Sequence, residues 1–437
     1  MTSKTGCNTY YICFIMIDDQ SEVKRFFNMI FAEWYSWTER KNRMTDSTQT
    51  KKQAGRSTLM LGMLMIAVFF SMGSRAIFSP IMPALQSELH ISLATAGTLF
   101  LFISISYAAA MLFCGFLTVR VGHGLTIVAA LASIAAGLFF SAIAAGVVLL
   151  SIGMIFIGAG AGAYPPSGLA MINRKIRPEG RTIAFALHEI SPNLALLLAP
   201  LIVLVAEPWV GWRGVLLAMA AVCGAATFAF WRWGISDSGV GAAPKLRTIG
   251  IILRMRNTYM GMILLSAAAA GLQGVYAILP AYLVAQSSHS IEYVNVLLTA
   301  SRLVSIVFLL CSGMIVRHIG KRNTMLMALL FTSACTGLIG FLDGTILDVI
   351  IVAQPALIAG MIPPFLASIA DIGDSEYQNI TYGVIITVGI SVGGGVVPSL
   401  LGIFGDLGLG WLGFVSLAGF MFAAAIMLLA TPRFGQD

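Results

Sequence analysis

The sequence is a succession of apolar runs, each about as long as a membrane crossing and separated by short polar breaks. A helix rises about 1.5 Å per residue, so about 20 apolar residues span the hydrocarbon core of a bilayer. Only 10% of the 437 residues are charged, against about 25% in soluble domains. Most of the surface is therefore expected to face lipid. The pattern predicts twelve transmembrane helices, at 59–83, 94–118, 124–144, 146–171, 183–206, 212–233, 258–285, 293–316, 323–342, 346–369, 380–404 and 409–430.

Residues 1–57 differ from the rest of the chain, because charged and other polar residues are frequent there. The apolar piece at 10–17 is shorter than a membrane span and lacks the small-residue cleavage site of a signal peptide. We expect residues 1–57 to form a polar cytoplasmic segment. This segment is either disordered, an extension upstream of a true start at Met44, or an amphipathic surface helix around 23–37.

Lysine and arginine gather in the loops that follow the even-numbered predicted helices, and acidic residues gather mainly on the other side. Cytoplasmic loops carry an excess of Lys and Arg, so both termini are expected in the cytoplasm. The net charge of +7 is interpreted as an orientation signal, and nucleic acid is not an expected partner. The expected location is the inner membrane of a bacterium. The basic loop residues include Arg120, Arg174, Arg247 and Arg317, and the acidic ones include Glu88, Glu207 and Glu292.

Short motifs recur at a nearly constant distance along the chain. Four matches at corresponding places indicate an internal repeat. The sequence therefore predicts an all-α membrane protein in which two pseudo-symmetric six-helix bundles, 58–233 and 258–437, are joined by a cytoplasmic linker at 234–257. The matched pairs are Gly115 with Gly313, Ala161 with Ala359 and Pro200 with Pro398, all 198 residues apart, and Gly211 with Gly410, 199 residues apart.

The loop after the second predicted helix carries a pattern of glycine and basic residues that returns in the second half. The residues of this pattern are Gly115, Leu117, Arg120 and Gly122 in the first half and Gly313, Gly320, Lys321 and Arg322 in the second. With them, the loop is similar to the signature G-x-L-x-D-R-x-G-R/K, and the chain resembles the major facilitator superfamily of secondary transporters over about residues 57–433. The resemblance implies a transporter that works by alternating access, and not an enzyme.

The signature's aspartate position holds Val119 in the first half and Arg317 in the second. That acid is thought to help latch one state in the family, so the latch is expected to differ here. Glycine-rich helices and Pro-Pro pairs would let helices bend as gates, and static close packing is the alternative. The residues assigned to gating are Gly115, Arg120, Gly122, Gly313, Arg317, Gly320, Pro165 and Pro363.

Two arginines lie well inside predicted spans, Arg75 in the first helix and Arg302 in the eighth. Each is predicted to lie roughly 12 Å from the outer face of the membrane. A cation there is expensive and normally faces protein, water or a ligand. Because the resembled family lines its cavity with both helices, the two guanidinium groups are predicted to bind an anionic substrate by bidentate hydrogen bonds. A structural ion pair or snorkelling to the interface is the alternative for each.

Three neutral polar residues are further candidates for substrate binding. Gln273 stands 198 residues after Arg75 and is therefore its symmetry mate, and Tyr276 follows one helical turn later. Both could donate hydrogen bonds to the same substrate, or they could only satisfy contacts between helices. Tyr107 in the second helix is a weaker candidate.

Glu189 is the acidic residue that we place well within a span, roughly 9 Å from the cytoplasmic end of the fifth helix. Burial favours the protonated form of a carboxyl group, which suits a proton carrier. We therefore predict proton coupling by Glu189 with its neighbour His188. The alternative is a structural ion pair with Arg181, His188 or a group of the eighth helix.

The sequence contains no recognisable catalytic constellation, metal-ligand spacing or nucleotide-binding loop, so no cofactor or metal is expected. The predicted function is proton-coupled uptake of a small organic anion by a secondary transporter. An exporter of a small organic compound and a non-transporting membrane sensor are the alternatives. The expected partners are a small anionic substrate, protons and the lipid bilayer, and the protein is expected to be a monomer.

Overall fold

The structure is a computed structural model that describes residues 48–234, 250, 252–253, 255–287, 289–370, 378–431 and 434. The chain divides into two compact units, residues 1–59 and 60–437, and the architecture below concerns the second. Most of the predicted cytoplasmic segment 1–57 and of the linker 234–257 lies outside the described residues. Residues 48–57 are helical, although disorder was one expectation for them.

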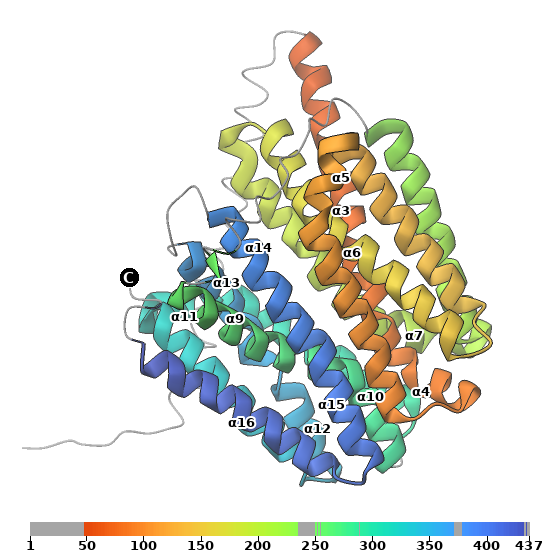
Figure 1. Ribbon diagram of the computed structural model, residues 1–437, viewed down its shortest axis with the longest axis vertical. Helices are drawn as coiled ribbons and strands as arrows, with labels where there is room; N and C mark the ends of the chain where they lie inside the picture. Colours follow the sequence, from red (N-terminus) through yellow and green to blue (C-terminus); the bar gives the residue numbers. More distant parts are fainter. Residues whose placement is uncertain are drawn as a thin grey trace, which may run out of the picture. The chain divides into compact units, whose positions relative to one another are not determined.

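The described elements are all helices, and no strand occurs within the described ranges. Three of them are short π-helical stretches, marked η: η1 directly follows α7, while η2 and η3 each lie directly between two α-helices. Figure 1 shows the long helices running roughly alongside one another. The elements are α3 (Thr48–Ala76), α4 (Phe78–Leu89), α5 (Leu93–Ala142), α6 (Val147–Lys175), α7 (Pro178–Ala229), η1 (Phe230–Gly234), α9 (Arg256–Ala269), η2 (Ala270–Gly274), α10 (Val275–Ser287), α11 (Ile291–Ile339), α12 (Gly344–Ala353), α13 (Ala356–Ala370), α14 (Gln378–Ser391), η3 (Val392–Val396), α15 (Val397–Asp406) and α16 (Gly410–Leu429).

Nine helical stretches in the described part of the chain are long and apolar enough to cross a membrane. Three of them are 49 to 52 residues long, and each contains one glycine with non-helical backbone angles and positive φ. Glycine adopts positive φ readily because it lacks a Cβ atom, and such a residue reverses or ends a helix. Each long stretch is therefore two helical segments joined by a turn, while the count of twelve crossings stays a prediction. The three glycines are Gly122, Gly211 and Gly320.

The predicted repeat is visible in local hydrogen bonding and backbone conformation. Each half contains a serine that caps a helix through its side-chain oxygen, a glycine at φ of 80° or 81°, and a threonine that donates to that glycine's carbonyl at 2.8 Å. The offset between the halves is 198 residues in all three cases, as the sequence motifs predicted. The matched pairs are Ser92 with Ser290, Gly122 with Gly320 and Thr126 with Thr324.

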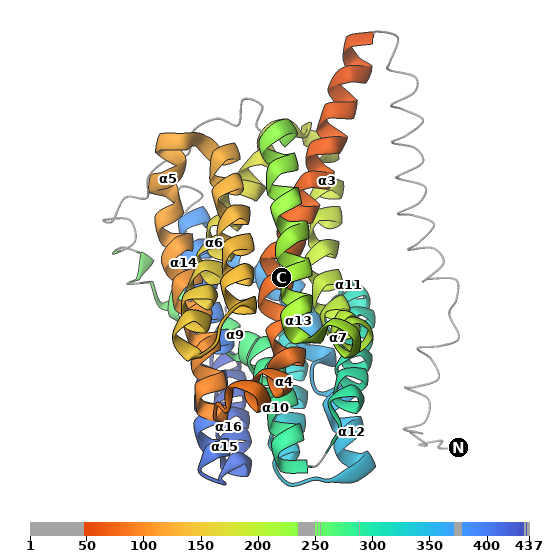
Figure 2. The ribbon, with the colours of Figure 1, turned by 90° about the vertical axis from the view of Figure 1, so that its right-hand side faces the viewer.

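The two repeats contact each other along α4 with α10 and along α5 with α15, which lie side by side in Figures 1 and 2. Asp406, the last residue of α15, accepts hydrogen bonds from the backbone N–H groups of Leu93 and Ala94 at 2.9 Å each. These are the first amides of α5, which have no partner inside their own helix. Gly402 packs against the carbonyl of Leu93, where a Cβ atom would clash. A carboxylate from the second repeat therefore caps a helix of the first.

The structure corrects one prediction about the end of a helix. The first span runs over Ser57–Leu89 and not 59–83, so it extends further at its C-terminal end. The Pro-Pro pairs that begin at Pro165 and Pro363 lie inside α6 and α13 without ending either helix. Proline removes one backbone hydrogen bond, which a long packed helix tolerates.

Candidate functional site

Arg302 is buried in α11, with 3% of its surface exposed. Its Nη2 atom donates to the carbonyl oxygen of Leu272 in η2 at 3.0 Å. Its guanidinium carbon lies 4.1 Å from the centre of the Tyr276 ring, a cation–π arrangement. The Nε and Nη1 atoms are buried and have no acceptor among the described residues. The side chain is thus held by one hydrogen bond and one ring, with two donor groups still unused.

Tyr276 also has an unused polar group. It belongs to α10, and its hydroxyl is buried without a hydrogen-bond partner in the described structure. Its backbone carbonyl accepts a hydrogen bond from the Ser79 hydroxyl of α4, so this turn of α10 lies against the first span. The free hydroxyl and the free nitrogens of Arg302 therefore belong to the same arginine–tyrosine pair.

Arg75 forms a second arginine–tyrosine pair in the first repeat. Its guanidinium carbon lies 4.8 Å from the centre of the buried Tyr107 ring in α5. Its Nε donates to the carbonyl of Ser71 at 3.3 Å, and its Nη2 approaches the sulfur of Met72 at 3.3 Å, a weak acceptor. The side chain is half-buried. Arg75 is therefore held by long bonds to its own helix and by one ring of the next.

Neither arginine forms an ion pair within the described part of the chain, where the ion pairs join other residues. Counted from the observed helix ends, Arg75 lies roughly 21 Å from Leu89 and Arg302 roughly 16 Å from Ile291. Both distances exceed the roughly 12 Å predicted, because the helices begin or end further along the chain than the sequence suggested. A guanidinium group at this depth is unfavourable unless it meets water or an anion.

Gln273, the symmetry mate of Arg75, lies in η2 and is half-buried. Its Oε1 atom faces Gly394 of η3, since a Cβ atom built there would come within 3.4 Å of it. The two π-helical stretches pack directly together, because Gly274 approaches the carbonyl of Gly393. π-Helical turns free carbonyl groups and are frequent at functional sites. Here the carbonyl of Leu272 in η2 is the acceptor for Arg302.

The predicted coupling residues occupy a second cluster. His188 is 3% exposed, and its Nδ1 atom lies 3.5 Å from Glu189 Oε1. Its Nε2 atom lies 2.8 Å from the hydroxyl of Tyr164, which donates to the carbonyl of Leu64 at 2.7 Å. The Glu189 side chain is 66% exposed, although the sequence suggested a buried carboxyl. It is close enough to act electrostatically on the Tyr382 hydroxyl of α14.

Sequence reasoning missed Tyr164. The residue is 1% exposed, and it stands directly before the Pro-Pro pair of α6 in a run of small residues. A tyrosine in such an apolar helix signals a buried hydroxyl that needs a partner. The pattern gave that hint, but it could not indicate that the partners come from α3 and α7.

The residues assigned to gating fall into two groups. Two are the positive-φ glycines of the turns, and the others lie inside helices, with both arginines exposed at the surface. The turn glycines are Gly122 and Gly320, and the helical residues are Gly115, Arg120, Pro165, Gly313, Arg317 and Pro363.

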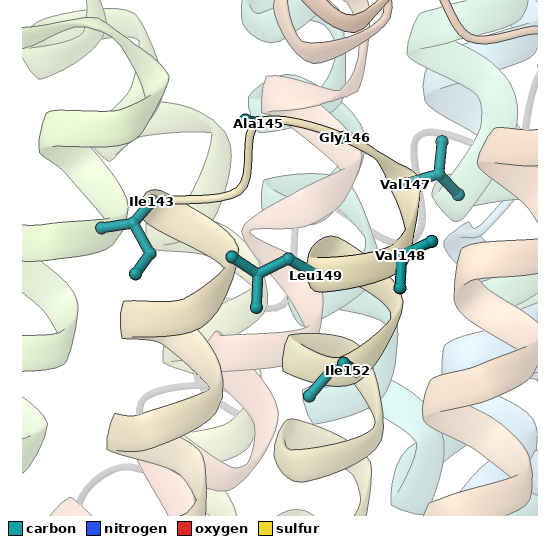
Figure 3. Close-up of a pocket in the computed structure, with 7 residues that line it drawn as sticks. All are labelled: Ile143, Ala145, Gly146, Val147, Val148, Leu149 and Ile152. Carbon is teal, nitrogen blue, oxygen red and sulfur yellow. The ribbon is translucent and has the colours of Figure 1, made fainter.

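Figure 3 shows a pocket at the turn between α5 and α6. Its lining residues are Ile143, 145–149 and Ile152, which are all apolar. The pocket therefore offers no charged or hydrogen-bonding side chain for an anion. No group of three or more His, Cys, Asp and Glu side chains in the described ranges could hold a metal ion. The arginine–tyrosine pairs and the His188 cluster therefore remain the candidate sites.

Several solved structures have a similar fold at low sequence identity. A bacterial homologue of the human lysosomal transporter Spinster, in an inward-facing and unoccupied conformation, has a TM-score of 0.68 and 13% identity over 87% of this chain and 98% of its own. The nucleoside transporter NupG has a TM-score of 0.69 and 13% identity over 85% and 98%. A variant of the peptide transporter POT has a TM-score of 0.70 and 16% identity over 86% and 94%. At these identities the likeness establishes the fold alone.

No curated protein sequence gave a significant match. The sequence profile of the Major Facilitator Superfamily matches residues 64–398, which is more than half of the chain. The match extends over both repeats and includes Arg75 and Arg302. The chain therefore belongs to the major facilitator superfamily, and it is a multi-pass membrane transporter rather than an enzyme.

Proposed function

We propose that the protein takes up a small organic anion together with protons, by alternating access of a site between the two repeats. The observation that carries this proposal is Arg302, a buried cation with two unused donor nitrogens and no ion pair in the described structure. An arginine deep in a membrane protein costs from about 2.5 kcal/mol upward. A substrate carboxylate would offset that cost by accepting the unused hydrogen bonds.

The chemistry of the pair favours a carboxylate or a similar planar oxyanion. A guanidinium group donates in a rigid fork that matches two carboxylate oxygens. Nη2 carries two hydrogens, so its bond to Leu272 leaves one bidentate edge of Arg302 available. The unpartnered Tyr276 hydroxyl would add a third donor to the same anion. Arg75, which has only weak partners, is the proposed contact from the first repeat.

Proton coupling is proposed from the balance of charge and from the His188 cluster. An anion that enters with one proton carries no net charge, so a membrane potential that is negative inside does not oppose its uptake. Glu189 and His188 supply adjacent groups that can each accept a proton.

The fold does not choose the substrate. The similar structures are described as nucleoside, peptide and lysosomal-type transporters, which are different chemical classes on one architecture. The assignment of an organic anion therefore rests on the side chains of this chain. Export of a small organic compound, and a sensor that keeps the fold without transport, are outcomes that the experiment distinguishes.

The test is uptake of radiolabelled small carboxylates into proteoliposomes, with and without an inward proton gradient. At least one carboxylate is expected to accumulate only when the gradient is present, and Arg302→Gln is expected to abolish saturable uptake. Arg232→Gln removes an exposed cation of η1 and is the matched control, with wild-type uptake expected.

Three other results would contradict the proposal in different ways. Unchanged uptake and saturation in Arg302→Gln and Arg75→Gln would remove the anion site. Movement of a neutral or cationic compound only outward would indicate an exporter. Failure of every solute to move in either direction, with folded protein in the vesicles, would indicate the sensor.

A further inference from the structure

The Tyr164–His188 contact determines where the histidine carries its proton. A carbonyl oxygen only accepts hydrogen bonds, so the Tyr164 hydroxyl must donate its single hydrogen to Leu64 across the 2.7 Å contact. The hydroxyl oxygen is then an acceptor toward His188 Nε2 at 2.8 Å. The Nε2 atom must therefore carry a hydrogen. The hydrogen is assigned in this way because each of the two hydrogen bonds, from His188 to Tyr164 and from Tyr164 to Leu64, needs one donor and one acceptor.

A neutral imidazole has one N–H group, so Nδ1 of His188 holds a lone pair. Nδ1 is buried and has no hydrogen-bond partner among the described residues. The nearest acid is its own neighbour, with Glu189 Oε1 at 3.5 Å. A proton added at this lone pair is stabilised by the adjacent carboxylate, because the resulting cation lies next to a negative charge.

We infer that Tyr164 is a positioning residue that fixes the His188 tautomer, so that the transported proton binds at Nδ1 beside Glu189. The inference rests on the proton coupling proposed above and names the atom that takes the proton. The proton comes from water and forms one N–H bond at Nδ1. The cationic ring keeps its Nε2–H bond to Tyr164 and donates its new hydrogen to the Glu189 carboxylate. The 3.5 Å separation then shortens to about 2.8 Å.

Side chains of α6 and α7 contact this ring, and groups of α3 and α14 lie near those side chains. Tyr164 of α6 stacks on His188 with ring centres 6.0 Å apart and planes 11° apart. Glu189, the next residue of α7, has its Oε1 atom 3.5 Å from Nδ1 of His188. The carbonyl of Leu64 belongs to α3, and the Tyr382 hydroxyl of α14 is within electrostatic reach of Glu189. No further charged side chain makes a hydrogen bond or ion pair with His188 in the described part of the molecule.

Leu64 and Arg75 lie on the same helix, α3, with roughly 16 Å of helix axis between them.

The direct test is solid-state ¹⁵N NMR of histidine-labelled protein in liposomes, which reports the protonation of each ring nitrogen. The chain has five histidines, and His188→Gln identifies the relevant signal by its loss. Wild-type His188 is expected to be a single Nε2–H tautomer at high pH and to gain its proton at Nδ1 as the pH falls. Tyr164→Phe removes the acceptor and is expected to give a mixture of tautomers. Tyr259→Phe, which changes an exposed tyrosine, is the control.

The transport measurement adds a second readout. Tyr164→Phe is expected to shift the pH midpoint of gradient-driven uptake by about one unit, with the KM for the anion changed less than about twofold. His188→Gln keeps a donor toward Tyr164 without a titrating nitrogen, so accumulation should be lost while exchange of anion across the membrane remains. This variant preserves the packing if Tyr164→Phe fails to fold.

Two results would overturn the inference. One is an Nδ1–H tautomer in the wild type, and the other is an unchanged tautomer in Tyr164→Phe. Neither measurement depends on transport. Wild-type uptake that is independent of the proton gradient would contradict the proposed proton coupling. If the tautomer results are still as expected, Tyr164 positions His188 without a role in coupling.

Discussion

The two arginine–tyrosine pairs use the same contact but exchange the helices that carry it. In the first repeat the arginine, Arg75, lies on the first span and stacks on Tyr107 of the second. In the second repeat the tyrosine, Tyr276, lies on the first span of that half and the arginine, Arg302, on the next. The residue 198 positions after Arg75 is Gln273. The repeat therefore preserves backbone geometry and the kind of contact, but not the position of the charge.

The two pairs also differ in how much of their hydrogen-bonding capacity is used. Arg302 is buried with two free nitrogens, and the hydroxyl of its tyrosine is free as well. Arg75 is half-buried and bonds within its own helix. A buried donor without an acceptor is the more expensive state, so the second-repeat pair should gain more when an anion binds. The difference gives an expected order for the effects of mutations.

The largest effect is expected from replacing each arginine by lysine, which keeps the charge and removes the planar fork. Arg302→Lys should raise the KM for the anion about 100-fold, and Arg75→Lys about 10-fold, because charged hydrogen bonds contribute about 1.5–3 kcal/mol. The concentration dependence of initial uptake rates measures both. Equal effects at the two positions would remove the distinction between the pairs.

An intermediate effect is expected on stability, and here the repeats should behave alike. Gly122→Ala and Gly320→Ala force a Cβ atom into positive φ, at a cost of about 1–3 kcal/mol each. Thermal or denaturant unfolding in detergent should show similar losses for the two variants. Gly224→Ala is the control, because its helical position has open space for a methyl group and should not destabilise the protein. Clearly unequal losses would mean that the two turns are not equivalent.

The smallest effect is expected from removing single hydroxyl groups. Tyr276→Phe should raise the KM for the anion about threefold to tenfold, since one hydrogen bond contributes about 0.5–1.5 kcal/mol. Tyr107→Phe keeps the ring under Arg75 and should change the KM less than about twofold. The concentration dependence of initial uptake rates measures both constants. A larger effect at Tyr107 would make the first-repeat pair the main site.

The membrane class, the repeat and the two intramembrane cations could all be predicted from the sequence. Apolar length and internal spacing are local properties, and an arginine at the centre of an apolar run is visible without any partner. The offset of 198 residues was confirmed by the paired serine caps and by Gly122 with Gly320. The family was confirmed by the match over residues 64–398.

The partners of these residues could not be predicted, because they come from other helices. Periodicity does not tell which tyrosine lies under which arginine, and it gave no weight to Tyr164. The exposure of Glu189 also depends on how neighbouring helices pack. The C-terminal end of the first span was placed too early, since α4 continues through Pro83 to Leu89.

The hydrogen bonds from the N-terminus of α5 to Asp406 stabilise conformations in which α15 and α5 remain in contact. Separating α15 from α5 would leave the amides of Leu93 and Ala94 to find water or another acceptor. Losing a helix cap costs about 1 kcal/mol. About 1.4 kcal/mol corresponds to a tenfold change in an equilibrium constant. Removing this one carboxylate would therefore change severalfold the ratio between conformers with α15 and α5 in contact and conformers with them apart.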